Sequence, residues 1–295
     1  FVLSDWAIFR DAGEQTFNPT QKQTPNDIAM PWGVETLSRE QRFAKAVNAG
    51  CDQLGGEEDV VTMLNAIDNG LISESRIDEA VYRMLVQKFE QGLFESPFVD
   101  VTTADELVGS GRARAAGRNA QRRSIICLKK PSSVNSSTRY YLENFSLSQG
   151  GEVTSLNDAD AAIIKLSTPH QDLHPNFFFG SRQQEGDIDF KPTLQVAKRI
   201  KALSKKVPTI AVIQMSRPAV VTDIINDLDG LYVDLGVSDD LMINAISSQI
   251  ETEGTLPFEL PRSMHAVRSQ RPDYPSDSQD ALFQVGADYK NNEGL

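Results

Sequence analysis

Asp5 is the first side chain in this sequence whose type and position suit chemistry. It stands in the stretch Ser-Asp-Trp, directly after the apolar residues 1–3, which predict a buried β-strand. An ionised carboxylate at the end of a strand is suited to nucleophilic attack. The same carboxylate also suits a cap for the segment that follows the strand, and spacing alone favours this structural role.

Two histidines form a second candidate group. His170 and His174 are spaced i and i+4, so on one helix they would share a face and could bind one metal ion. Pro169 and Pro175 flank this pair and argue against a helix, and no third ligand stands out. We therefore interpret the histidines as polar loop residues and predict no metal site.

The composition excludes several classes of function. The chain has 295 residues, and its 41 acidic against 29 basic side chains give a formal charge of −12. This excess of acid argues against a nucleic-acid partner. The longest apolar runs are too short to cross a bilayer, so no membrane partner is predicted. The glycines near Gly55 and Gly109 lack the spacing of a phosphate-binding loop, and no cofactor is predicted.

The first ninety residues predict about two strands and three helices. A polar loop follows from Asp11 to Trp32, and a helix over 39–48 begins after Ser38 as its N-cap. A short strand is predicted over 51–54. Two further helices follow, the second with Ser75 and Asp78 placed for a capping box and an apolar stripe at Ile77, Ala80, Val81, Met84, Leu85 and Phe89. A strand pair with both edges open is a poor isolated domain, so another segment must cover it.

The rest of the chain predicts an open α/β domain. An extended segment near 94–103 leads into a basic helical stretch over 104–123. The runs "SIICLKK", "AAIIKLS", "TIAVIQM" and "GLYVDLG" are apolar on both faces, as strands of a parallel sheet covered by helices are. Helical patterns separate the later runs. The tail after Pro272 is polar and is predicted to be partly loose.

Several longer stretches resemble one enzyme family. "SDW", "AVNAGCDQLGG", "ISESRIDEAVYRMLVQKFEQGLFESPFVD", "SRPAVVTDI" and "GTLPFELPRS" are similar, in this order, to landmarks of glycoside hydrolase family 3, which includes β-glucosidases and β-xylosidases. The resemblance implies the α/β class, with a (β/α)8-like barrel before an α/β sandwich domain. Residues 1–94 would be the closing part of the barrel, 95–110 a linker, and 111–295 the sandwich domain with its tail.

The resemblance also implies roles for individual residues. Asp5 would be the nucleophile, and Trp6 beside it would be a platform for a sugar ring. The acid/base would come from the loop at 165–190, where Glu185 is the first candidate and Asp172 the second. The family pattern in this loop differs here, and either carboxylate can equally be read as a solvated surface group. His170 is expected near the sugar.

The implied function is that of a retaining, exo-acting β-glycosidase that removes terminal β-linked sugars by double displacement, without a cofactor. Its partners would be a carbohydrate substrate and an N-terminal barrel segment, in the same protein or as a separate chain, that lies before Phe1. Such enzymes are commonly exported, so a secreted or periplasmic location is expected. The alternative is a catalytically inactive relative that serves as a carbohydrate-binding or assembly subunit.

Overall fold

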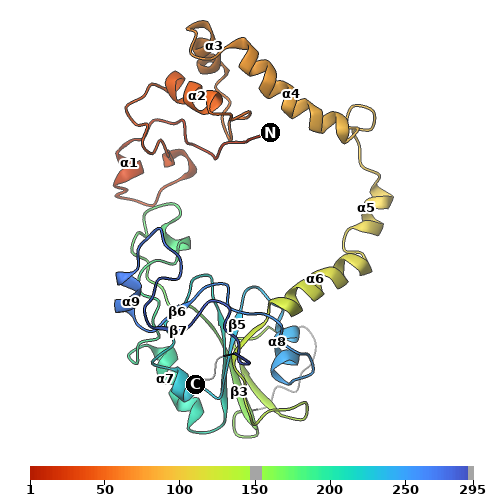
Figure 1. Cartoon of the computed structure of the whole chain (residues 1–295), viewed down its shortest axis with the longest axis vertical. Helices are drawn as coiled ribbons and strands as arrows, with labels where there is room; N and C mark the ends of the chain where they lie inside the picture. The colour runs from red at the N-terminus through yellow and green to blue at the C-terminus, as the bar shows by residue number, and fades with distance from the viewer. Residues whose placement is uncertain (147–154, 292–295) are drawn as a thin grey trace. The chain divides into compact units, whose positions relative to one another are not determined.

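The computed structural model describes residues 1–146 and 155–291 and divides the chain into two compact units (Figure 1). Unit 1 consists of Phe1–Asp105 together with Asp172–Gln184. Unit 2 consists of Glu106–Gln171 and Glu185–Leu295. A short segment from the middle of the sequence therefore belongs to the unit that carries Asp5.

Side-chain caps set where the helices of unit 1 begin. Ser38 accepts a hydrogen bond from the Gln41 amide at 3.3 Å, and α2 starts at the next residue, as predicted. The capping box predicted at Ser75 is wrong, because Ser73 is the N-cap of α4. The elements are α1 (Glu14–Phe17), η1 (Pro25–Asp27), α2 (Arg39–Asn48), α3 (Val60–Asp68), α4 (Glu74–Glu90) and α5 (Val101–Leu107), which runs on into unit 2.

The two strands predicted in unit 1 form a single parallel bridge between Leu3 and Gln53. The Ser4 amide extends it by donating to the Gln53 carbonyl at 2.9 Å. The prediction of a buried strand over residues 1–3 is wrong, since these side chains are 46–57% exposed. Apolar residues become buried only where neighbouring segments cover them, and here one segment pairs along one edge.

The helices of unit 1 bury little of their apolar surface. Of the stripe predicted on α4, Ala80 is buried, whereas Val81, Leu85 and Phe89 are exposed. A small core of Ala44, Val47, Ala66 and Ile72 joins α2 to α3 and the turn after it. The exposed apolar side chains of α3 and α4 are Val60, Val61, Leu64, Val81, Tyr82, Leu85 and Phe89.

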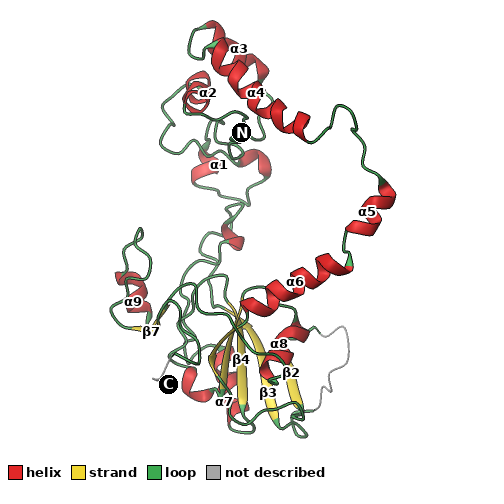
Figure 2. Cartoon of the chain, turned by 45° about the vertical axis from the view of Figure 1, so that its right-hand side comes forward, coloured by secondary structure: helices red, strands yellow, loops and turns green. Residues whose placement is uncertain are grey.

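Unit 2 is built on a five-stranded sheet with the order β1-β5-β4-β3-β2. Figure 2 shows β4, β3 and β2 of this sheet side by side. Neighbours from β2 to β5 run parallel, whereas β1 pairs antiparallel with β5. The sequence predicted four of these strands in a parallel sheet, so the direction of β1 and the presence of β2 are corrections. The strands are β1 (Ile126–Lys129), β2 (Tyr140–Glu143), β3 (Ala161–Ser167), β4 (Thr209–Gln214) and β5 (Gly230–Asp234).

Helices cover both faces of this sheet (Figure 1). On β4, Ala211 and Ile213 face a core that includes α7 (Gln195–Ser204). Ile210 and Val212 alternate with them and face the core of α8 (Asp239–Ile246). This alternation follows from the two-residue period of a strand, and it confirms the α/β class predicted from strands that are apolar on both sides.

The C-terminal tail is more ordered than predicted. β6 (Leu260–Pro261) pairs antiparallel with β7 (Ala281–Phe283), and Phe283 is only 1% exposed in the core beside α7. The expectation of a partly loose tail is therefore wrong for β7, while residues 292–295 lie outside the described residues. The remaining elements are α6 (Gly111–Ser124), η2 (Gly180–Arg182), η3 (Ile225–Asp227) and α9 (Met264–Ser269).

Candidate active site

The Asp5 side chain is exposed and lies just after the parallel bridge of unit 1. Its Oδ1 accepts a hydrogen bond from the Trp6 amide at 2.7 Å, which is the local cap that the spacing favoured. Ser4 links this segment to the next turn, because its Oγ accepts from the Gly55 amide at 2.8 Å. Residues 4–6, here called the Asp5 ledge, are thus held by hydrogen bonds, and the Asp5 side chain remains open to solvent.

A glycine pair lets the turn at residues 55–56 lie directly against this ledge. A Cβ on Gly55 would fall 2.2 Å from the Ser4 carbonyl oxygen. A Cβ on Gly56 would fall 2.1 Å from Cδ1 of Trp6, and Gly56 has a φ of +61°. Trp6 therefore rests on backbone on one side, and its 58% exposure leaves apolar ring surface open, as stacking on a sugar requires.

Gly56→Ala should displace the Trp6 ring and destabilise unit 1 by more than the ~1–2 kcal/mol of left-handed backbone alone. Gly33→Ala is the matched control, because Gly33 has a φ of +77° but no atom within 4 Å of a built Cβ. Tryptophan near-UV circular dichroism and urea unfolding would measure both effects. Equal losses in the two variants would show that the contact with Trp6 contributes nothing.

The chain turns sharply two residues after Asp5. Ala7 has a φ of 61°, in the left-handed region that costs an alanine about 1 kcal/mol or more. Its carbonyl accepts from the Met30 amide at 3.0 Å, and its side chain is buried. Strained backbone of this kind persists where surrounding contacts determine it, and it is frequent at functional sites.

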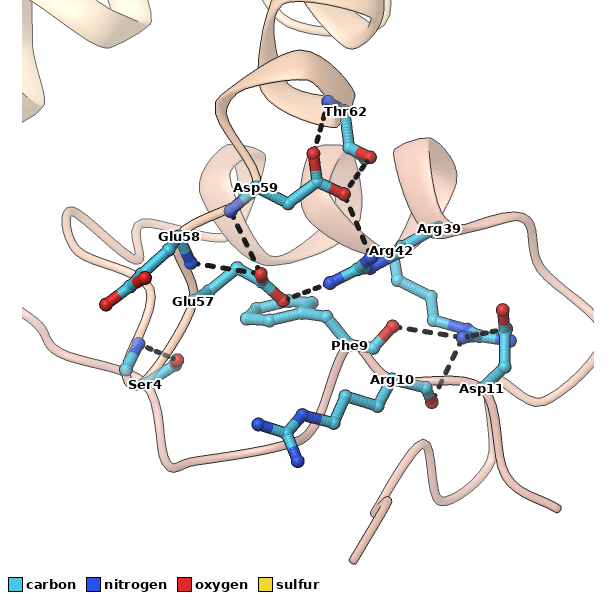
Figure 3. A network of polar contacts seen from close by, with 11 residues as sticks. Ser4, Phe9, Arg10, Asp11, Arg39, Arg42, Glu57, Glu58, Asp59 and Thr62 are labelled. Atoms are coloured by element: carbon cyan, nitrogen blue, oxygen red, sulfur yellow. Dashed lines mark hydrogen bonds and ion pairs between the residues drawn. The ribbon is translucent and has the colours of Figure 1, made fainter. Parts of the chain in front are cut away.

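Arg42 of α2 holds the segment that follows this turn (Figure 3). Its buried guanidinium donates to the carbonyls of Phe9 at 3.1 Å and Arg10 at 3.3 Å, and pairs with the Asp11 carboxylate at 2.8 Å. It also donates to the carbonyls of residues 34 and 35. Sequence analysis did not identify this residue, because an arginine inside an amphipathic helix carries no local sign that it is buried.

A second network holds the turn that carries the glycine pair (Figure 3). Arg39 pairs with Glu57 at 2.7 Å and with Asp59 at 2.9 Å. Glu57 also accepts from the amides of Glu58 and Asp59, and Asp59 caps α3 by accepting from the Thr62 amide at 3.0 Å. Both sides of the Asp5 ledge are thus attached to α2, one through Arg39 and the other through Arg42.

Asp52 secures the strand that leads to Asp5. Its carboxylate accepts from the Val2 amide at 3.0 Å and pairs with Arg76 at 2.9 Å and Arg83 at 3.2 Å. The Val2 hydrogen bond, together with the two guanidinium groups, lowers the pKa of Asp52 despite the opposing effect of burial. The anchor therefore needs the ionised carboxylate.

A lowered pKa gives stability that is present above the unfolded-state pKa and is lost as pH falls through the folded-state pKa. Unit 1 should therefore lose stability below about pH 4, the ordinary range of aspartate. Asp52→Asn should be less stable at neutral pH and should show a smaller further loss on acidification. Urea unfolding at several pH values would measure this. The same acid dependence in the variant and the parent chain would contradict the role of Asp52.

The candidates from the 165–190 loop fall in different units. Asp172 lies in unit 1, whereas His170 and Glu185 lie in unit 2. The Gln171 amide donates to the Glu185 carbonyl at 2.8 Å. This hydrogen bond joins the two ends of the segment 172–184. Asp187 pairs with Lys191 and Arg268, and the Lys191 hydrogen bond lowers its pKa, which is opposite to what a proton donor requires.

His170 lines a cavity of about 610 Å³ at the carboxyl ends of β3 and β4. The wall includes Asn144, Gln195 and Gln214, which offer neutral hydrogen-bonding groups. Lys165 also lines it, with its ammonium paired to Asp234 at 3.1 Å and Asp239 at 2.7 Å. Leu166, Leu194 and Val196 add apolar surface, so the cavity wall is mostly apolar and carries a few neutral polar groups.

Within residues 1–146 and 155–291, no group of three or more histidine, cysteine or acidic side chains is placed to hold a metal ion. No helix in that part of the chain is both long and apolar enough to cross a membrane.

Comparison with known proteins finds no matching family model. The chain is, however, 38% identical over 97% of its length to a periplasmic β-glucosidase/β-xylosidase of Dickeya chrysanthemi, covering 45% of that protein. The chain is a relative of the β-glucosidases and β-xylosidases. This relationship confirms the resemblance seen in the sequence. A probable β-glucosidase C of Aspergillus oryzae is 35% identical over 97% of the chain and 44% of its own length.

Solved structures agree on the fold of this β-glucosidase relative. A β-glucosidase of Listeria innocua in complex with glucose matches 97% of the chain and 46% of its own chain, with a TM-score of 0.64 and 16% identity. An exo-1,3/1,4-β-glucanase of a Pseudoalteromonas species matches 85% of the chain and 39% of its own, with a TM-score of 0.63 and 21% identity. The chain spans somewhat under half the length of these two curated relatives.

Proposed function

We propose that this chain is the C-terminal part of a retaining, exo-acting β-glycosidase of glycoside hydrolase family 3. The observation that carries the proposal is the 38% identity over 97% of the chain to a β-glucosidase/β-xylosidase. The geometry at Asp5 supports it, because an exposed carboxylate follows a parallel strand pairing beside an exposed tryptophan. Barrel enzymes place catalytic groups at the carboxyl ends of parallel strands.

In the first step, Asp5 forms a bond to the anomeric carbon while the bond to the leaving oxygen breaks. A second carboxylic acid donates its proton to that oxygen. In the second step, the same group takes a proton from water, and the water oxygen displaces Asp5 from the sugar. Trp6 would support the apolar face of the sugar ring, and His170 would contact its hydroxyl groups.

Glu185 and Asp172 are the two candidates for the acid/base. Removing the true acid should slow substrates with poor leaving groups by about 10²- to 10⁴-fold, and activated aryl glycosides much less. Azide should rescue that variant and give a glycosyl azide of retained configuration. Glu185→Ala and Asp172→Ala, assayed in parallel, would assign the role. Neither variant showing this selective loss would exclude both residues.

An upstream barrel segment of the same protein is proposed as the partner of unit 1. The exposed apolar residues 1–3 and the exposed apolar faces of α3 and α4 support it, because such surfaces usually mark an interface. Denaturing electrophoresis and intact mass of the purified protein would test the partner. The upstream segment should appear as a second polypeptide or as part of a longer one. A homogeneous 32.6 kDa species that hydrolyses β-glycosides by itself would contradict it.

A secreted or periplasmic location is proposed on the same basis. The Dickeya chrysanthemi relative is named as periplasmic, and the fungal relatives are named as β-glucosidases. Fractionation of source cells, followed by detection of this chain with an antibody, would test the location.

Trapping with a fluorinated β-glycoside is the decisive test of the function. The fluorine slows breakdown of the covalent intermediate, so the sugar should remain attached to the peptide that contains Asp5 and be found by mass spectrometry. Turnover without a covalent intermediate would contradict the retaining mechanism. No label and no turnover, with sugar binding kept, would favour the inactive carbohydrate-binding subunit instead.

A further inference from the structure

The segment Asp172–Gln184, here called the arm, joins unit 1 although the chain on both sides of it belongs to unit 2. At its base, the Asp187 amide donates to the Gln171 side-chain oxygen at 3.1 Å, and Arg217 donates to the Gly186 carbonyl at 2.9 Å. The base is therefore held within unit 2. Its middle makes hydrogen bonds to residues of unit 1.

Gln23 makes two of these hydrogen bonds. Its backbone amide donates to the Asn176 carbonyl at 2.8 Å, and its side-chain oxygen accepts from the Phe178 amide at 2.8 Å. The other end of the same carboxamide donates to the carbonyls of Gln15 at 2.6 Å and Thr16 at 3.2 Å. One side chain thus connects the arm to the helix α1 and satisfies its own polar atoms on both sides.

Two observations show that the connection between the arm and unit 1 is specific. Gln23 is only 8% exposed in an otherwise polar surface loop, and a buried amide is costly unless it is fully hydrogen-bonded. Asn176 adds a second link, because its side chain donates to the Pro19 carbonyl at 2.9 Å.

The arm is also closely packed against itself between His174 and Gly180. A Cβ on Gly180 would fall 1.8 Å from the His174 carbonyl oxygen, which shows how closely the arm folds on itself. The His174 and Phe177 rings meet edge to face at 5.5 Å. Asp172 is the first residue of this segment, and Glu185 directly follows its last residue.

We propose that Gln23 is a positioning residue for the acid/base of the enzyme. It acts by fixing the arm, which begins at Asp172 and ends directly before Glu185, to the same unit as Asp5. The inference rests on the proposed function. A carboxylic acid must stand within hydrogen-bonding reach of the leaving oxygen, and a displacement of about 1 Å can cost about 10²-fold in rate.

Gln23→Met tests the hold itself, because methionine keeps the volume and removes both ends of the carboxamide link. Gln21→Met is the matched control, since Gln21 is exposed in the same loop. Hydrogen exchange of the whole chain, read on peptides covering 172–184, should be slow in the parent and in Gln21→Met and at least tenfold faster in Gln23→Met. Fast exchange in the parent, or no change in Gln23→Met, would overturn the proposal.

Kinetics of the active assembly test positioning against mere stability. In Gln23→Met, kcat for phenyl glycosides should fall at least ~10-fold, whereas kcat for dinitrophenyl glycosides, which need little acid assistance, should fall less than ~3-fold. Equal losses on both substrates would indicate a structural role and overturn the proposal. A parent assembly that hydrolyses no β-glycoside would instead refute the proposed function, and hydrogen exchange would still decide whether Gln23 holds the arm.

Discussion

Asp5→Asn should lower kcat/KM of the assembled enzyme for β-glycosides by about 10⁴-fold or more, because it removes the only group proposed to form the covalent intermediate. The fold should persist, since the amide keeps the volume of the side chain and can still accept the hydrogen bond from the Trp6 amide. Steady-state kinetics and tryptophan circular dichroism would measure the two properties separately.

Two controls sharpen this result. Asp68→Asn changes an exposed aspartate at the end of α3 and should leave activity unaltered. Asp5→Gly with added azide should regain turnover and give a glycosyl azide of inverted configuration, because azide would then attack from the side that Asp5 occupied. An Asp5→Asn enzyme with parental kcat/KM would remove the chemical basis of the proposed function.

Arg42→Met should destabilise unit 1 by about 3 kcal/mol or more. The change removes the guanidinium donor from four backbone carbonyls, of which that of Phe9 is buried, and leaves the Asp11 carboxylate without its cation. Arg42→Lys should recover little, because an ammonium cannot reproduce the planar set of five donors. Both tryptophans, Trp6 and Trp32, lie in unit 1, so their fluorescence during urea unfolding reports this unit alone.

Arg39→Met is the matched control for Arg42. Arg39 also extends from α2 and pairs with acidic side chains, those of Glu57 and Asp59. Its side chain is 33% exposed, so solvent can replace the lost contacts. Arg39→Met should therefore lower the stability of unit 1 much less than Arg42→Met does. Similar losses for the two variants would show that the carbonyl contacts of Arg42 add nothing beyond charge pairing.

Local signals predicted the elements that local interactions determine. α2 has the predicted bounds because Ser38 caps it and its apolar residues recur at helical spacing. β3 has the bounds of the run "AAIIKLS" because residues buried on both faces can belong only to a covered strand. The α/β class followed from these runs and from the helical patterns between them.

The errors arise where distant segments decide the outcome. The direction of β1 depends on its pairing with β5, more than a hundred residues later, and nothing within Ile126–Lys129 encodes that direction. β7 was missed because it is only three residues long and is stabilised by β6 and by burial of Phe283. The exposure of residues 1–3 depends on what else covers them, which their own apolar character does not specify.

The candidate site shows the same division. Asp5 became a candidate through its position after a strand, together with a family resemblance of its surroundings. Arg42 and Gln23 were not identified, because each is a polar residue whose importance comes from burial against carbonyl groups distant in sequence. Contacts of this kind leave no local motif and are recognised only in the three-dimensional structure.

The arm has one further consequence for handling the protein. A single protease cut near residues 95–100 would leave the arm covalently joined to the C-terminal fragment, while Gln23 stays on the N-terminal one. Such a cut would turn the arm contact into association between two polypeptides, no longer favoured by the high effective concentration that an intact backbone provides. The dilution at which the nicked halves separate would therefore report how strongly the contacts across the break bind, those of Gln23 and Asn176 among them.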